Sequence, residues 1–511
     1  MPRRLLRRLP LGRALRRAAT RIEGSLALYC GIDIGTSSIK CLLVDENGSR
    51  RGLGRAPVGL YRGDAGYEAD PLEWLKACAA AYAEASEATG LGEAGLRDRL
   101  RAVAISGNGP TLVAAGRDGL PVGRACSWMD RSAVAEAARV SEAAGRAVDP
   151  SFYLPKALRV LGSEAGGSVS KFFSGPEYLA FTLGAAPVSY LVDDYYDAFV
   201  WDRATGARLG LDSALFPPYV DPAKVIGEVS ANAAEAVGLP AGLPIVSGFP
   251  DFLAALVGSG AVSPGLACDR SGSSEALNVC AQRPFPDRSI FSLPHAVRGL
   301  WNLSGGLSTS GKALEWFSGV AGYSGIGSDS VYQDAERVAA GADGLLFLPY
   351  LAGERAPLWN SSLRGAFFGL SLAHGRREMA RAVVESLAYG LRLAADRIRG
   401  GEFRIDVARC SGGAARDSML CAIKADVLGI AIEVPENPEC EAMGDACACA
   451  VALSEHASLK DASNAMVRIA SRYEPDDASS AIYEERFVAW KDALDAAIRL
   501  SSPRNAPYKE P

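Results

Sequence analysis

Histidine and paired cysteines are scarce in this 511-residue sequence. It contains only three histidines, which lie far apart, and none of its 11 cysteines forms a Cys-x-x-Cys pair. Since zinc sites are usually built from clustered histidines and paired cysteines, the sequence argues against one. An odd number of cysteines in a long chain also argues against a disulfide framework. We interpret most of them as small core residues in a reducing cytoplasm.

Long apolar runs and an excess of basic charge are also missing. No run of about 20 apolar residues is present, so no membrane-spanning helix is predicted. The formal net charge is −5, whereas a surface that binds nucleic acid would need a basic stripe. We therefore expect neither a membrane nor nucleic acid among the partners.

The first residues differ from the rest of the chain in composition. Eight arginines lie between Arg3 and Arg21, and no acidic residue precedes Glu23. This composition is typical of an organelle transit peptide, but it also fits a disordered tail or a start codon assigned too far upstream, which we favour. We therefore treat residues 1–26 as an Arg-rich leader outside the fold.

The length and the order of the predicted elements favour two α/β domains. A single core rarely grows beyond about 250–300 residues. Apolar runs flank a Gly-Thr-Ser-Ser turn at 28–45, and the same pattern returns around Gly-Ser-Ser at 266–279. Helices are predicted at 71–87, 377–399 and 416–428 from apolar residues at helical spacing. These two strand–turn–strand segments could be copies in a duplicated fold, although a short repeat of Gly and Ser residues is weak evidence for duplication.

The first of these turns carries groups that suit a phosphate. Gly35, Thr36 and Ser37 supply backbone N–H donors and hydroxyls, and Asp33 stands two residues before the glycine. A carboxylate at the mouth of such a turn could hold Mg²⁺ through water, because Mg²⁺ keeps several water ligands. The same residues also fit an ordinary hairpin turn. The sequence has no Gly-x-x-x-x-Gly-Lys-Ser/Thr motif, so it is not a P-loop protein.

Five stretches of the chain form an ordered series. They are Gly-Ile-Asp-Ile-Gly-Thr-Ser-Ser-Ile-Lys at 31–40, Lys171–Gly184, Gly365–Leu370 followed by Glu378–Glu385, Ser411–Ala414 and Glu441–Ala446. In this order they resemble the motifs of the FGGY carbohydrate kinases, the family of xylulokinase, glycerol kinase and ribulokinase. The resemblance extends from about residue 28 to about residue 455.

The resemblance implies an α/β fold with two RNase H-like domains of the actin and hexokinase type and ATP in the cleft between them. It implies an N-terminal domain at 27–262 that binds sugar and phosphate. It also implies a C-terminal domain at 263–475 that binds the nucleotide, followed by a helix and tail at 476–511. ATP and Mg²⁺ are the implied cofactors, and the implied reaction is in-line phosphoryl transfer.

A catalytic aspartate is implied on the loop at 244–258. Asp251 fits that position, since it stands before an apolar helix that ends in glycine. Its carboxylate would accept the proton of the attacking hydroxyl. The alternative is that Asp251 only caps the helix. Phe249-Pro250 replaces the glycine that is usual in the family, so the shape of this loop differs from that of relatives.

The sugar pocket matches the family pattern only in part. Asn108 lies where xylulokinases carry Gln-Met-His-Gly, and the histidine is absent. Trp128 and Asp130 resemble the Trp-x-Asp-x-Arg region, where the aspartate binds sugar hydroxyls, but a buried Trp and a capping Asp are the alternative. Arg159 stands where a Trp is usual, which weakens a xylulose assignment. The predicted substrate-binding residues are Asn108, Trp128, Asp130, Asp251 and Phe252.

The nucleotide contacts implied by the resemblance come from both halves of the chain. The predicted ATP-binding residues are Gly35, Thr36, Ser37, Lys40, Ser271, Gly272, Ser273, Gly311, Glu315, Gly412, Gly413, Ala414 and Asp417. Asp33 is the predicted Mg²⁺ residue, acting through water.

We therefore expect an ATP-dependent kinase that phosphorylates a small sugar or polyol, with a ketopentose such as xylulose as the first candidate. Another pentulose or polyol is the alternative within kinases. A regulator that binds ATP and sugar on the same fold without transfer is the alternative outside them, because a fold does not fix a function. We expect a cytoplasmic protein, for which a homodimer is a possible assembly.

Removal of residues 1–26 is expected to leave folding and activity intact, because no apolar pattern in this segment could contribute to a core. The melting temperature and the kinase activity of the truncated chain test this expectation. A large drop in melting temperature would contradict it.

Overall fold

The computed structural model describes residues 26–63, 66–190, 201, 203–323 and 329–501. The predicted leader lies outside the described residues except for Leu26. The chain divides into two compact units. Unit 1 comprises Met1–Gly258 and Glu441–Val467, and unit 2 comprises Ser259–Cys440 and Arg468–Pro511.

Unit 1 is built on a six-stranded sheet with the order β10-β11-β6-β1-β2-β3. β1, β2 and β3 are antiparallel neighbours, whereas β6 runs parallel to both β1 and β11. Every residue of β1 is buried, as expected for a central strand covered on both faces. The strands are β1 (Leu28–Ile34), β2 (Ser38–Asp45), β3 (Arg50–Pro57), β6 (Leu100–Gly107), β10 (Val225–Glu228) and β11 (Pro244–Pro250).

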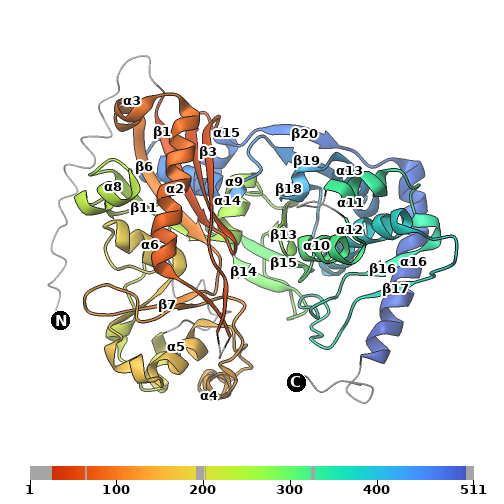
Figure 1. Cartoon of the computed structure of the whole chain (residues 1–511), viewed down its shortest axis with the longest axis horizontal. Helices are drawn as coiled ribbons and strands as arrows, with labels where there is room; N and C mark the ends of the chain where they lie inside the picture. The colour runs from red at the N-terminus through yellow and green to blue at the C-terminus, as the bar shows by residue number, and fades with distance from the viewer. Residues whose placement is uncertain (1–25, 64–65, 191–200, 202, 324–328, 502–511) are drawn as a thin grey trace. The chain divides into compact units, whose positions relative to one another are not determined.

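Helix α2 (Pro71–Thr89) covers one face of this sheet and packs along β2 and β3 (Figure 1). The side chain of Asp70 caps its first turn, Pro71 is its first residue, and Gly90 in a left-handed conformation ends it. The sequence-based prediction at 71–87 is therefore confirmed. Further helices of unit 1 are α3 (Gly92–Arg99), α6 (Gly175–Leu183) and α8 (Ala231–Val237).

A second sheet in unit 1 has the order β4-β5-β8-β7-β9. It packs with short helices around a separate apolar cluster that includes Leu112, Tyr153, Leu154, Phe172 and Trp201. Its strands are β4 (Tyr61–Gly63), β5 (Gly66–Ala69), β7 (Leu112–Ala115), β8 (Ala125–Cys126) and β9 (Lys171–Ser174), and its helices are α4 (Val134–Ala144), α5 (Tyr153–Leu161) and α7 (Arg203–Arg208).

Unit 2 repeats the central topology of unit 1. Its seven-stranded sheet has the order β14-β15-β13-β12-β18-β19-β20. β12 and β13 are antiparallel, and β12, β18 and β19 are parallel, as β1, β6 and β11 are in unit 1. The strands are β12 (Leu266–Ser271), β13 (Glu275–Ala281), β14 (Phe291–Pro294), β15 (Trp301–Leu307), β18 (Val407–Gly412), β19 (Ala431–Pro435) and β20 (Ile469–Tyr473). The two strand–turn–strand segments noted in the sequence therefore occupy equivalent places in two α/β sheets.

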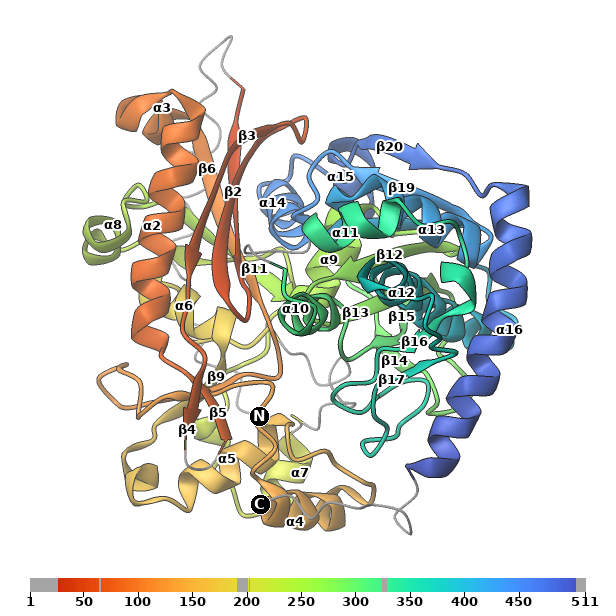
Figure 2. The ribbon, with the colours of Figure 1, turned by 45° about the vertical axis from the view of Figure 1, so that its right-hand side comes forward.

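The core of unit 2 centres on the long helix α12 (Arg376–Arg399), which confirms the helix predicted at 377–399. α16 (Asp477–Leu500) lies along one side of unit 2 and contributes Tyr483, Phe487 and Trp490 to the same core (Figure 2). The helix predicted at 416–428 begins later, as α13 (Ser418–Leu428), because Asp417 caps it after a short 3-10 turn. Also present are α10 (Gly311–Val320), α11 (Asp329–Glu336), β16 (Leu346–Leu348) and β17 (Ala366–Phe368).

Residues 441–467 return to unit 1, whereas the resemblance placed them in the nucleotide domain. They form α14 (Cys440–Ala452) and α15 (Leu459–Met466). α14 approaches β1 closely: a Cβ atom on Gly31 would lie 1.8 Å from the carbonyl oxygen of Ala442. A Cβ on Gly444 would likewise lie 2.1 Å from the carbonyl oxygen of Ala254, in α9 (Asp251–Ser259). Backbone contacts of this kind are possible only without side chains, so glycines fix this helix in unit 1.

Across the part of the chain that the structure describes, no helix combines the length and apolar character needed to cross a membrane.

One buried histidine of unit 2 predicts a loss of stability in acid. His295 is fully buried after β14; its Nε2 lies 3.0 Å from the carbonyl oxygen of Ala261, and its Nδ1 accepts a hydrogen bond of 2.9 Å from the N–H of Val297. Burial lowers the pKa of His295 from 6.5 to about 4. The unfolded chain therefore takes up a proton near pH 6.5, while the folded chain stays neutral down to about pH 4.

We expect stability to fall as the pH drops from about 6.5 towards 4, by roughly 3 kcal/mol from this residue. His295→Asn keeps an acceptor for Val297 but cannot take up the proton, so it should flatten this pH dependence while lowering stability at pH 7. Denaturant unfolding at pH 7.5, 6 and 5 measures the slope, with His374→Asn, at a partly exposed histidine, as the control. Equal slopes in wild type and His295→Asn would refute the assignment.

Candidate functional site

Three neighbouring parallel strands of unit 1 end at one edge of its sheet. Ile34 of β1 lies opposite Gly107 of β6, which in turn lies opposite Pro250 of β11. In open α/β sheets, ligands commonly bind beyond the carboxyl ends of such strands. The residues that follow the three strands are Gly35, Asn108 and Asp251, all of which the sequence had predicted.

The turn after β1 brings the predicted phosphate and sugar residues together. The N–H of Gly35 donates to the carbonyl oxygen of Ser38 at 3.0 Å, which closes the turn. The hydroxyl of Thr36 accepts a hydrogen bond of 3.0 Å from Nε1 of Trp128. Ser37 is exposed at the tip of the turn. Thr36 and Trp128 are thus direct neighbours, although the sequence assigned them to different ligands.

A chain of hydrogen bonds continues from Trp128. Its backbone N–H donates to Oγ1 of Thr111 at 3.1 Å, and that hydroxyl donates to Oδ1 of Asn108 at 2.6 Å. The side-chain amide of Asn108 donates to the carbonyl oxygen of Ile34 at 3.0 Å. Thr111, which sequence reasoning missed, therefore holds two predicted residues in place.

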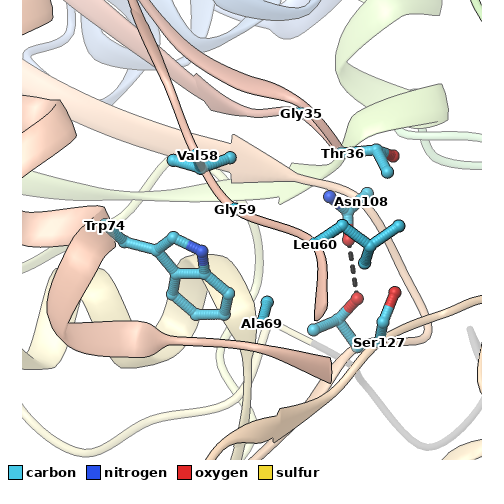
Figure 3. A pocket seen from close by; sticks show the side chains of 10 residues that line it. Gly35, Thr36, Val58, Gly59, Leu60, Ala69, Trp74, Asn108 and Ser127 are labelled. Atoms are coloured by element: carbon cyan, nitrogen blue, oxygen red, sulfur yellow. Dashed lines mark hydrogen bonds between the residues drawn. The ribbon is translucent and has the colours of Figure 1, made fainter. Parts of the chain in front are cut away.

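These residues line a recess of unit 1 with one polar and one apolar side. Figure 3 shows Thr36, Asn108 and Ser127 on the polar side and the Trp74 ring with Val58 on the other. The recess is small, with free space of about one water molecule, and the Trp74 ring belongs to the core of unit 1. The complete lining is Gly35, Thr36, Val58, Gly59, Leu60, Ala69, Trp74, Asn108, Thr111 and Ser127.

Asp130 is fully buried and is engaged by protein groups. Its Oδ2 accepts from Nη2 of Arg159 at 2.6 Å, and its Oδ1 accepts from the hydroxyl and the N–H of Ser132 at 2.7 and 2.9 Å. The arginine that replaces the usual Trp of the family thus pairs with the aspartate predicted to bind sugar. A sugar hydroxyl would have to share this carboxylate with Arg159.

A buried lysine joins the two loops that carry Asn108 and Trp128. Lys156, on α5, is fully buried, and its Nζ donates to the carbonyl oxygens of Pro110 and Ser127, each at 2.7 Å. Burial lowers its pKa to about 7. The sequence analysis gave this lysine no role, although a lysine inside the apolar run 153–158 was a usable signal.

Asp251 is the first residue of α9 and is 7% exposed. Its Oδ1 accepts a 2.7 Å hydrogen bond from the N–H of Phe252, which is itself partly buried. Burial raises the pKa of the Tyr153 phenol well above its usual range, and the charges of Glu177 and Asp251 add to this effect. Asp251 therefore has a local contact at its helix terminus and lies within electrostatic reach of Tyr153.

Two carboxylates lie close together behind the first turn. Asp33, at the end of β1, is 3% exposed, and Nζ of Lys40 lies 3.7 Å from its Oδ2. Asp445 on α14 is fully buried. Burial raises the pKa of Asp445 well above its usual range, and the charge of Asp33 adds to this effect. Sequence reasoning quoted Asp445 only within a motif and did not expect it beside Asp33.

The corresponding turn of unit 2 is held by the N-terminus of α10. The N–H groups of Ser310 and Lys312 donate to the carbonyl oxygen of Ser273 at 3.0 and 3.2 Å, and that of Gly311 donates to Gly272 at 3.0 Å. In a trans peptide the N–H points opposite to the C=O. The N–H groups of Ser273 and Ser274 therefore point away from α10. On that side they could donate hydrogen bonds to the oxygens of a phosphate.

The second nucleotide loop lies beside this turn. Gly412 of β18 pairs with Ser271 of β12, and its φ of +72° suits glycine. The N–H of Gly413 donates to the carbonyl oxygen of Ser271 at 3.1 Å. The structure thus brings together Ser271, Gly272, Ser273, Gly311, Gly412, Gly413 and Ala414.

Two predicted nucleotide residues have other partners in this structure. Asp417 caps α13 by accepting from the N–H of Leu420 at 2.8 Å. Glu315, an exposed residue of α10, pairs with Lys312 at 2.8 Å. Neither contact prevents a nucleotide contact, because both residues lie next to the loops described above.

Comparison with known proteins places both units in one family. The model of the N-terminal domain of the FGGY family of carbohydrate kinases matches residues 28–150, and that of its C-terminal domain matches residues 270–453. The resemblance stated from the sequence motifs is therefore confirmed.

Individual relatives are similar over almost their whole length. A xylulose kinase of Staphylococcus epidermidis is 26% identical over 92% of this chain and 97% of its own. A gluconokinase of Bacillus subtilis is 26% identical over 89% of this chain and 93% of its own. The crystal structure of a gluconate kinase from Lactobacillus acidophilus superposes with a TM-score of 0.79 over 94% of this chain and 99% of its own, at 22% identity, which shows a shared fold.

Thr36→Val removes the hydroxyl of the first turn and keeps the shape of the side chain. We expect the KM for ATP to rise by about tenfold, the size of one hydrogen bond, and the KM for the sugar to change less. Steady-state kinetics with each substrate varied in turn measure both values, and Thr36→Ser, which keeps the hydroxyl, is the control. Unchanged ATP kinetics would show that the turn is only a hairpin.

Proposed function

Because this chain belongs to the FGGY family of carbohydrate kinases and phosphorylates a hydroxyl of a sugar or polyol with ATP, we propose that its acceptor is a ketopentose such as xylulose. Relatives named xylulose kinase that match most of this chain support this choice.

The observation that carries the mechanism is the position of Asp251. It follows β11 at the sheet edge where Asn108 follows β6 and the Gly35–Ser37 turn follows β1. We propose that Asp251 accepts the proton of the sugar hydroxyl as that oxygen attacks the γ-phosphorus of ATP. The bond from the γ-phosphorus to the bridging oxygen breaks, and ADP leaves.

The remaining groups would orient the two substrates. Asn108, Trp128 and Phe252 would contact the sugar, and Asp130 would bind a sugar hydroxyl while it remains paired with Arg159. The proposed nucleotide ligands are the Gly35–Ser37 turn, Lys40, Ser271–Ser273, Gly311, Glu315, Gly412–Ala414 and Asp417.

Asp33 fits a role in binding Mg²⁺ through water. In phosphoryl-transfer enzymes Mg²⁺ is commonly bound by one or two carboxylates together with water and substrate phosphates. The described residues contain no group of three or more histidine, cysteine or acidic side chains that could enclose a metal ion. Asp33 would supply one such carboxylate at the end of β1. When bound, the ion would neutralise charge on the phosphates.

A sugar acid such as gluconate is the second candidate acceptor. A relative named gluconokinase matches most of this chain, and Arg159 places a guanidinium beside the sugar-binding loops. ADP release measured over ketopentoses, aldoses, polyols and aldonates decides between the candidates. If no compound stimulates ADP release while ATP and a sugar both bind, the chain is a regulator on the kinase fold.

We propose a cytoplasmic location. All 11 cysteines are free thiols and all are buried, which agrees with a reducing compartment.

Asp251→Asn keeps the size of the side chain and its acceptor for the N–H of Phe252, but it cannot take up a proton. We expect kcat to fall by about 10²–10⁴-fold, the usual contribution of a general base. Calorimetry should show ATP and sugar binding within a few-fold of wild type, since Asn caps a helix about as well as Asp.

The matched control is Asp476→Asn, which changes the capping aspartate of α16 in unit 2 and should leave kcat unchanged. If Asp251→Asn phosphorylates its sugar at a near-normal rate, Asp251 is only a helix cap and has no part in proton transfer.

A further inference from the structure

A fully buried cation lies beneath the phosphate turn of unit 2. Lys424 on α13 has no exposed surface, and its Nζ donates to Oδ2 of Asp269 at 2.6 Å and to Oε1 of Glu275. Asp269 lies on β12 and Glu275 on β13, the two strands joined by the Ser271–Ser274 turn. One lysine therefore binds both strands at the base of that turn.

Glu275 extends this network to the helix that holds the turn. Its Oε2 accepts a 2.7 Å hydrogen bond from the hydroxyl of Ser310, the residue before α10. The N–H of Ser310 in turn donates to the carbonyl oxygen of Ser273 at 3.0 Å. A continuous path of polar contacts thus leads from Lys424 through Glu275 and Ser310 to the tip of the turn.

The same lysine stands on the helix that begins at the second nucleotide loop. Asp417 caps α13, and the loop before it contains Gly412 and Gly413. Gly413 donates to Ser271 at the start of the turn. α13 and the turn are therefore joined on both sides, at the loop and at Lys424.

We propose that Lys424, with Glu275, is a positioning residue for nucleotide binding: it fixes the Ser271–Ser274 turn, the N-terminus of α10 and the start of α13 as one rigid half-site. The lysine itself is buried and touches no ligand. This inference rests on the proposed assignment of these loops to the nucleotide.

Charge balance explains why the lysine is needed. Burial raises the pKa of Glu275 to about 7, and the charge of Asp269 adds to this effect, whereas Lys424 and Ser310 act against it. Without Lys424, two buried carboxylates would face one another across the base of the turn. Removing one partner of a buried ionic network usually costs more than the network contributes, because the other charge is left unpaired.

The test compares Lys424→Met and Glu275→Gln with Glu385→Gln as the matched control. Glu385 is an equally buried glutamate of unit 2 that accepts hydrogen bonds from Arg381 at 2.7 Å, from the N–H of Gly341 and from the Tyr389 hydroxyl, and these three residues lie outside the nucleotide loops. Each protein is titrated with ADP and Mg²⁺, and separately with its sugar, by calorimetry. KM values for ATP and sugar are measured alongside.

We expect ADP binding to weaken at least tenfold in Lys424→Met and about three- to tenfold in Glu275→Gln, with sugar binding within twofold of wild type and Glu385→Gln unaffected. Glu275→Gln keeps the size of the side chain, so it decides the question if Lys424→Met does not fold. ADP binding within twofold of wild type in Glu275→Gln, or an equal loss in Glu385→Gln, would overturn the proposal. ADP binding is measured without turnover. A wild-type protein that phosphorylates no sugar would therefore refute the proposed function, while the ADP titrations would still test the role of Lys424 and Glu275.

Discussion

The geometry of the proposed site depends on the register of parallel strands. β1, β6 and β11 are paired so that all three end at one level, and a shift of one residue would move the turn, Asn108 and Asp251 apart. Both faces of these strands are buried, so a one-residue slip would exchange the two sets of side chains and force each to pack in a space shaped for the other. Unit 2 uses the same arrangement for Ser271 and Gly412.

The sequence predicted those secondary-structure elements that depend on local residues and on a periodic apolar pattern. The strand–turn–strand elements, α2 and α12 follow from apolar periodicity together with glycines and capping residues, and the structure confirms them. The sequence motifs also located three site residues, Thr36, Asn108 and Asp251. Each follows the end of a strand within two residues, so the strand determines where it lies. The roles of these residues remain predictions.

The sequence could not show which charges become partners in the folded chain. Lys424 lies among Leu420, Ile423 and Val427 on a largely buried, apolar helix, and its burial depends on acids about 150 positions earlier in the chain. Arg159 and Asp130 are likewise paired only once helix α5 packs against the loop that carries Asp130. The return of 441–467 to unit 1 depends on close backbone contacts at Gly31 and Gly444, which no periodicity reveals.

That return has a consequence for synthesis on the ribosome. Unit 1 is interrupted by the 182 residues of Ser259–Cys440, so α14 leaves the ribosome only after most of unit 2 has been made. Until then the strand that bears Asp33 lacks the helix that covers it at Gly31. The core of unit 1 therefore stays incomplete while residues 259–440 are synthesised. During this time its apolar surface is exposed and can be bound by chaperones.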